Sequence, residues 1–414
     1  MSQIHYRITK DSSAKRRFSI FKSKWFQIFT IFLVAIVFNF GIFVRNTTSE
    51  NIFLNLSLDF IGEYDLPKGK FENTTIGGLS GLTYDPEIDR FYAVSDDRGF
   101  GTPARFYTLK LVWDESSKTQ VKLKKFEIEK VTFLTDRDGS YFSKGGTDTE
   151  GIALTPGKTL FISSEGDNNR NIPPFISEFD LSTGRKIQDL TLPHKYLPQF
   201  TTINGKQQLF NGIQNNVGFE SLSISPDGEP FRIYAATESN LFQDRDIPEL
   251  TRHEAKTEYQ GGVRCRFLHY LVSNNSPTLI GEYIYQLDYA PFGAIKHGLA
   301  DILALDGDGH FLTLERSAGI LGFGIKLYQT VISDATDVSQ FSTINNRGSS
   351  IKFMPKKLAL KVNNLNIALD NLEGITFGPK LPDGSKSILL ISDDNFRNAE
   401  KTQILLFRLV ERSQ

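Results

Sequence analysis

The chain has 414 residues with a net charge of −1 at pH 7, and 23% of its residues are charged. This balance excludes the strongly basic class of nucleic-acid-binding proteins, so we expect no nucleic-acid partner. Cys265 is the single cysteine, which excludes an intramolecular disulfide, and the sequence contains no Cys/His cluster of the kind that holds zinc.

The first predicted element is an apolar segment of 20 uncharged residues at positions 25–44. A helix of that length is about long enough to cross a bilayer core of about 30 Å. Residues 1–24 contain an excess of Lys and Arg, which favours a cytoplasmic position for that tail. We therefore predict a basic tail (1–24), a transmembrane signal anchor (25–44) and a linker (45–59). An uncleaved anchor is favoured over a cleaved signal, because no small-x-small site follows.

The remainder, residues 60–414, contains a repeated phrase and is expected on the extracytoplasmic side, periplasmic or extracellular. Five copies begin at Ser80, Glu150, Glu220, Asp301 and Glu373, so that successive starts are 70, 70, 81 and 72 residues apart. Each copy continues through a turn into a second apolar run that ends at a carboxylate, namely Asp96, Glu165, Glu238, Glu315 or Asp393. A regular period of this kind indicates a repeat architecture.

Each period accommodates four short strands, which predicts an all-β fold, a β-propeller with four-stranded blades. In the second copy the strands are expected at 151–154, 159–163, 175–179 and 186–192. The last copy has three strands, and residues 60–64 resemble the fourth strand of the third copy at 279–283. We expect this N-terminal strand to complete the last blade and close the ring, which removes an open sheet edge. Five blades are favoured, and a sixth within 196–215 or 336–360 is the alternative.

Charged side chains should gather at one rim of this propeller. The start of the first strand and the end of the second lie at the same end of an antiparallel hairpin, and the first strand lines the channel. All nine acids should therefore surround one opening: Glu150, Glu220, Asp301, Glu373, Asp96, Glu165, Glu238, Glu315 and Asp393. The loops at the same rim contain cations: Arg98, Arg105, Arg170, Arg264, Arg316, Arg397, Lys296 and His297.

Carboxylates so close together repel one another unless a cation separates them. Two arrangements satisfy this requirement. In one, each acid pairs with an arginine or accepts hydrogen bonds from loop amides, and the ring is architectural. In the other, some acids hold a hard cation such as Ca²⁺, which prefers oxygen ligands. The candidate ligands are Glu150, Glu165, Glu220, Glu238, Glu373 and Asp393, and the candidate catalytic groups that face an anionic substrate are Arg98, Arg316 and His297.

Six segments follow one another in a characteristic order: Gly77-Gly78-Leu79-Ser80-Gly81-Leu82, Tyr92-Ala93-Val94-Ser95-Asp96-Asp97-Arg98, Asp148-Thr149-Glu150-Gly151-Ile152-Ala153, Ser164-Glu165-Gly166, Gly218-Phe219-Glu220-Ser221-Leu222 and Asn371-Leu372-Glu373-Gly374-Ile375. This ordered set resembles the phytase-like domain family, described as "esterase-like activity of phytase". The resemblance covers residues 60–410. It implies an extracytoplasmic propeller with ester or phosphoester hydrolase activity, and propeller phytases bind phosphate through calcium-bridged carboxylates.

The leading hypothesis from the sequence is a membrane-anchored propeller that hydrolyses anionic esters, phosphomonoesters or phosphodiesters, with the help of Ca²⁺. The alternative is a non-catalytic module that binds a ligand or partner at the same rim, since fold alone does not determine function. A membrane-tethered structural scaffold is a third possibility. The sequence does not identify the substrate or the oligomeric state.

Overall fold

The computed structural model describes residues 52–114, 123–245, 262–345 and 350–412, and the strands below belong to one compact unit, Leu54–Gln414. The apolar segment 25–44 and its basic flank lie outside these residues. Within the described ranges, no helix combines the length and apolar character needed to cross a bilayer.

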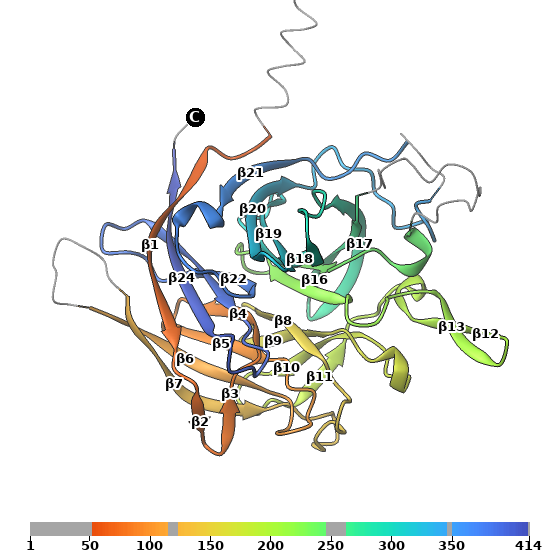
Figure 1. Cartoon of the computed structure of the whole chain (residues 1–414), viewed down its shortest axis with the longest axis horizontal. Coiled ribbons are helices and arrows are strands. Elements are labelled where there is room, and N and C mark those ends of the chain that lie inside the picture. Colours follow the sequence, from red (N-terminus) through yellow and green to blue (C-terminus); the bar gives the residue numbers. More distant parts are fainter. Residues whose placement is uncertain (1–51, 115–122, 246–261, 346–349, 413–414) are drawn as a thin grey trace, which may run out of the picture. The chain divides into compact units, whose positions relative to one another are not determined.

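The strands form five four-stranded antiparallel sheets, which are the blades of the propeller (Figure 1). Blade one contains β4 (Leu79–Asp85), β5 (Arg90–Ser95), β6 (Arg105–Trp113) and β7 (Leu123–Phe133). Blade two contains β8 (Thr149–Leu154), β9 (Thr159–Ser164), β10 (Phe175–Asp180) and β11 (Lys186–Asp189). Blade three contains β14 (Phe219–Ile224), β15 (Phe231–Thr237), β16 (Arg264–Ser273) and β17 (Ser276–Gln286).

Blades four and five complete the ring. Blade four contains β18 (Ala294–Ala304), β19 (His310–Gly319), β20 (Gly322–Val331) and β21 (Lys356–Lys361). Blade five contains β22 (Leu372–Gly378), β23 (Lys386–Ser392), β24 (Thr402–Glu411) and the N-terminal strand β1 (Leu56–Leu66). The innermost strands are β4, β8, β14, β18 and β22, and each contacts the next around the ring, including β22 with β4. The predicted propeller is confirmed.

The predicted closure by the N-terminal strand is also confirmed. β1 pairs antiparallel with β24, and Phe60 lies opposite Phe407 with 5.5 Å between the ring centroids. The last blade therefore combines the two ends of the propeller sequence. Because β1 satisfies the outer edge of β24, the joint is held by a complete strand pairing without a disulfide.

The alternative of a sixth blade is wrong. Within 196–215 the chain forms a two-stranded hairpin, β12 (Gln199–Ile203) and β13 (Lys206–Asn211). Among the described residues of 336–360, the one strand is β21 (Lys356–Lys361) of blade four. A second hairpin joins β2 (Gly69–Phe71) to β3 (Thr74–Ile76). The short 3-10 helices are η1 (Asn168–Arg170), η2 (His194–Tyr196), η3 (Phe242–Asp244) and η5 (Val362–Leu365).

Apolar side chains between neighbouring sheets form the core. One cluster joins blades four and five, a second joins blades two and three, and a third joins blades five and one. The inner strands also approach one another closely. A Cβ atom at Gly151 would lie 2.7 Å from the Cβ of Leu222 on the next inner strand, so a residue without a side chain is required there.

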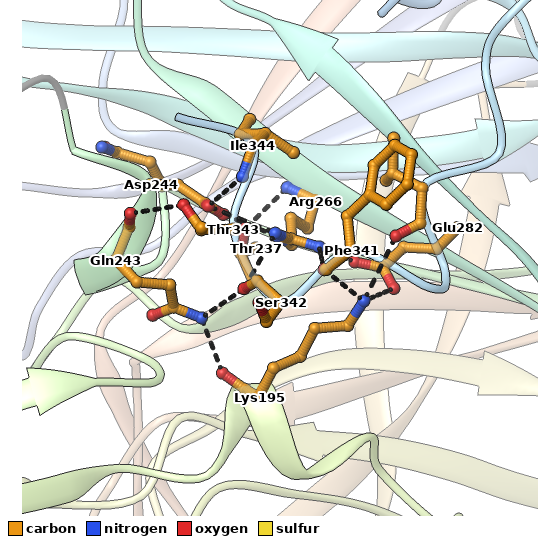
Figure 2. A network of polar contacts seen from close by, with 12 residues as sticks. Lys195, Thr237, Gln243, Asp244, Arg266, Glu282, Phe341, Ser342, Thr343 and Ile344 are labelled. Carbon is orange, nitrogen blue, oxygen red and sulfur yellow. Dashed lines mark hydrogen bonds and ion pairs between the residues drawn. The ribbon is translucent and has the colours of Figure 1, made fainter. Parts of the chain in front are cut away.

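A buried polar network attaches the loop 337–345 to blade three (Figure 2). Arg266 on β16 contacts Asp244 of η3 through Nε at 2.6 Å, and it also pairs with Glu282 of β17. Lys195 binds the second oxygen of Glu282 at 2.7 Å and donates hydrogen bonds to the carbonyls of Val338, Ser339 and Phe341. Two cations thus balance two carboxylates, and we assign this network a structural role.

Candidate metal and anion site at the channel mouth

Each inner strand has a β-bulge, close to the start of β4, β8, β14 and β22 and farther along β18, which re-aims one side chain toward the channel. The bulged residues are Ser80, Glu150, Glu220, Ala300 and Glu373. The residues at the equivalent register of the second strands are Asp96, Glu165, Glu238 and Asp393, which directly follow their strands, and Arg316, which lies within β19. These ten positions define the mouth of the channel.

Blade four departs from the sequence prediction by one residue on both strands. Ile302 of β18 pairs with Thr313, as Ile152 of β8 pairs with Ile162. The mouth positions of this blade are therefore Ala300 and Arg316, and the prediction that Asp301 and Glu315 lie at the mouth is wrong. The physical reason is the period of two along a strand, because a shift of one residue moves a side chain to the opposite face.

Asp301 instead links three inner strands. Its carboxylate accepts hydrogen bonds from the backbone N–H groups of Ile302 at 2.8 Å, Ile375 at 2.8 Å and Leu222 at 3.4 Å. Glu315 lies within blade four, where it binds Lys356 at 2.6 Å and accepts a hydrogen bond from the Tyr285 hydroxyl at 2.8 Å. Both acids therefore belong to the architecture of the ring.

Four of the remaining predicted acids, together with Asp148, form two groups of three that could hold a metal ion. The carboxylates of Asp148, Glu150 and Glu165 place one oxygen each within 4.8 Å of one another, as do those of Glu165, Glu220 and Glu238. All five residues are buried. Glu165 belongs to both groups, so that the two candidate ion positions are adjacent and share a ligand.

Burial raises the pKa of these carboxyl groups, and the neighbouring carboxylates raise it further. The pKa values of Glu150, Glu165, Glu220 and Asp393 lie well above the ordinary range. Burial raises the pKa of Asp96 to about 8, with further contributions from the charges of Glu373 and Asp148. Without a cation, the mouth would therefore hold protons at neutral pH.

Two arginines contact the acids, and the charge of one lysine acts on them. Arg316 is 4% exposed and bridges Glu238 at 2.7 Å and Glu373 at 2.8 Å. Arg98 binds both oxygens of Asp148 at 2.6 Å and keeps 34% of its side chain exposed. Lys296 is exposed on β18, and its charge acts on Asp148 and Glu373.

Other predicted cations lie away from the mouth. Successive side chains of β18 point to opposite faces of the strand, so His297 lies on the other face from Lys296 and Gly298. The Nε2 atom of His297 lies 2.9 Å from the carbonyl oxygen of Asp288. Gly298, by contrast, faces Glu238, since a Cβ atom there would lie 2.3 Å from its Cγ. We therefore place His297 on the face of β18 that points away from the acids.

Arg105, Arg170, Arg264 and Arg397 also have positions that the structure describes. Arg105 is fully buried in blade one with Asp97 at 2.8 Å, and Arg397 pairs with the nearby Glu400 at 2.8 Å. Arg170 stacks over Phe100, and Arg264 begins β16. Of the six predicted arginines, the structure thus brings Arg98 and Arg316 to the mouth acids.

Comparison with known families identifies the family to which the chain belongs. The family model described as "Phytase-like: Esterase-like activity of phytase" matches residues 74–396. The chain belongs to the phytase-like family. No curated protein sequence matches it.

Solved structures similar to this phytase-like chain have low sequence identity. They include the Kuenenia stuttgartiensis hydrazine synthase (11% identity, 79% of this chain and 81% of that chain, TM-score 0.33). They also include the Dos1 propeller (12% identity, 85% and 95%, TM-score 0.31) and the N-terminal domain of Nup159 (10% identity, 86% and 96%, TM-score 0.29).

Two residues of the site are not among those predicted from the sequence of the phytase-like chain. Asp148 is 2% exposed and belongs to the first acidic group. It stands two positions before Glu150, which was predicted. Asn371 donates a hydrogen bond to Glu373 at 2.9 Å and accepts one from Arg316 at 2.7 Å. Both lie just before an inner strand, so their position relative to the repeated phrase is the signal that could have identified them.

Proposed function

We propose that the mouth binds Ca²⁺ and hydrolyses anionic esters, with phosphoesters as the leading class. The observation that carries this proposal is the imbalance of buried charge. Eight carboxylates meet at the mouth, Asp96, Asp148, Glu150, Glu165, Glu220, Glu238, Glu373 and Asp393, against the three cations described above. An oxygen-only ligand set with excess negative charge fits a hard divalent cation.

Five of the six acids of the sequence prediction divide into two groups under this proposal, and Asp393 belongs to neither. Glu150, Glu165 and Glu220, with Asp148, would hold the cation, whereas Glu238 and Glu373 are already paired with Arg316. Bound Ca²⁺ would lower the pKa of a coordinated water and stabilise charge on the phosphoryl oxygens. The excess of negative charge therefore lies on the side of the mouth away from blade four, and we expect the cation on that side.

The side chains have distinct roles in this mechanism. Arg98 and Lys296 reach the mouth with exposed cationic groups and would attract and orient the anionic substrate. Burial and the neighbouring carboxylates raise the pKa of Asp96 to about 8 in the absence of a cation, which makes Asp96 the candidate proton donor to the leaving group. Arg316 is buried and paired, and it acts as a positioning residue for Glu238 and Glu373.

Calcium-dependent melting of the full chain, with a parallel phosphatase assay, tests this proposal. A site that binds Ca²⁺ only in the folded state must raise the melting temperature as the calcium concentration rises. Glu165→Gln should remove most of that increase and the turnover of phosphoesters, because Glu165 belongs to both acidic groups. Glu87→Gln, an exposed position in the turn between β4 and β5, is the matched control.

The two readouts separate the rival functions. A melting temperature that does not depend on the calcium concentration, together with equal turnover of phosphoesters in chelator and in calcium, would refute the metal-assisted mechanism. A calcium-dependent increase without turnover of any ester would favour the non-catalytic binding module.

We also propose that residues 25–44 anchor the chain and that the propeller lies on the extracytoplasmic side. The 20 uncharged residues and the basic flank support this localisation. Protease treatment of intact cells tests it, because digestion of the propeller from outside supports the proposal and full protection contradicts it.

A further inference from the structure

The inner strand of blade four extends farther beyond its bulge than the inner strands of the other blades. Six residues of β18, Ala294 to Leu299, precede its bulged residue Ala300, whereas one residue precedes the bulge in β4, β8, β14 and β22. The extra length continues into β19 and β20, which run to Gly319 and from Gly322. Two turns are thereby brought to the tip of blade four.

These turns carry an apolar surface, which we name the apolar tip: Tyr289, Phe292, Ile295, Ile320 and Leu321. Their exposed fractions range from 65% to 92%, and among the large apolar residues that the structure describes, these five are the most exposed. Phe292 and Leu321 line a common cavity of about 130 Å³, and the N–H of Ile320 donates a hydrogen bond to the carbonyl of Gly293. Apolar residues gathered in this way mark an interaction site.

The apolar tip is continuous with the mouth along a single strand. Ile295 is followed by Lys296, whose charge acts on Asp148 and Glu373, and Gly298 lies against Glu238. Three residues of a strand span about 10 Å. A ligand that enters the mouth with a polar group can therefore reach the apolar tip with a chain of modest length.

We propose that the substrate is amphiphilic, with an anionic ester head in the mouth and a hydrocarbon chain on the apolar tip. This inference deepens the proposed function and rests on it. Three of the five residues, Ile295, Ile320 and Leu321, are aliphatic, which suits an acyl or alkyl chain. The cation Lys296 between the two regions would meet the charged head.

The test is the affinity of a homologous series of n-alkyl phosphates, butyl to octyl, for the full chain in calcium by titration calorimetry. The dissociation constant should fall about two- to fourfold for each added methylene, because each buried methylene favours binding. The double variant Phe292→Ser/Leu321→Ser should flatten this dependence and leave butyl phosphate within twofold. Ile88→Ser/Ile280→Ser removes two exposed apolar side chains elsewhere and should behave as the parent.

The outcomes separate this inference from the proposed function. Glu165→Gln should weaken every phosphate equally and preserve the dependence on chain length. A dissociation constant that does not depend on chain length in the parent would overturn the inference. A dependence on chain length that remains in Phe292→Ser/Leu321→Ser would overturn it as well. Binding of 1-octanol that the same double variant abolishes, without binding of any phosphate, would support the apolar subsite and refute the anionic head. Self-association that the variant abolishes would assign the tip to a second copy and overturn the inference.

Discussion

Asp148→Asn should change how the stability of the protein depends on pH in a chelating buffer. Burial raises the pKa of Asp148 to about 6, despite the opposing effect of its ion pair with Arg98. An unfolded aspartate titrates near 3.9. The native state therefore binds the proton more tightly than the unfolded state, and stability from this group is lost as the pH rises from about 4 to about 6. A difference of about two pH units corresponds to about 3 kcal/mol.

Urea unfolding followed by the fluorescence of Trp113 measures this effect between pH 4 and pH 8. The unfolding free energy of the parent, relative to Asp148→Asn, should fall by about 3 kcal/mol across the lower half of that range and then remain level. The charge of Asp148 also helps to raise the pKa values of Glu150 and Glu165 in the parent. Asp148→Asn lacks this repulsion, which lowers the stability of the parent relative to the variant in the same direction. Asp59→Asn, exposed on β1, should reproduce the parent profile. An unfolding free energy of the parent, relative to Asp148→Asn, that stays constant or rises with pH would refute this account of the mouth.

Three further substitutions test the packing of charge and backbone by urea unfolding. Arg316→Met should destabilise the protein by about 3–5 kcal/mol, because Glu238 and Glu373 lose their common counter-ion; a loss below 1 kcal/mol would contradict the bridge. Glu282→Gln should cost a similar ~3–5 kcal/mol by unbalancing its buried network, whereas Asp334→Asn in an exposed pair should cost less than about 1 kcal/mol. Gly151→Ala should cost about 1–3 kcal/mol, while Gly157→Ala, where the nearest atom is 3.8 Å away, should be nearly neutral; equal effects would contradict the close approach of β8 and β14.

The sequence was sufficient to predict the blades and their closure, because these depend on period, turn residues and alternation. The match between 60–64 and 279–283 predicted the pairing of β1 with β24, which the structure contains. Such signals are local or repeated, so a single sequence contains them. The convergence of Glu150, Glu165 and Glu220 followed from the same hairpin geometry.

The positions in blade four could not be predicted in the same way. Asp301 and Glu315 imitate the acids of the other copies in sequence, but the bulge in β18 places Ala300 and Arg316 at the mouth. A bulge inserts one unpaired residue without a fixed sequence signature, and it reverses the direction of every side chain that follows. Cross-strand pairing is needed to recognise the correct register.

Arg316 has a consequence for how a ligand can approach the ring. Five equivalent blades would offer a ligand five orientations of similar energy, each rotated from the last. With one guanidinium in place of a carboxylate, the electrostatic potential of the opening is asymmetric, and a dipolar molecule has a single preferred orientation. Arg316 thereby removes the equivalence of the orientations that the repeated blades would otherwise offer to a ligand.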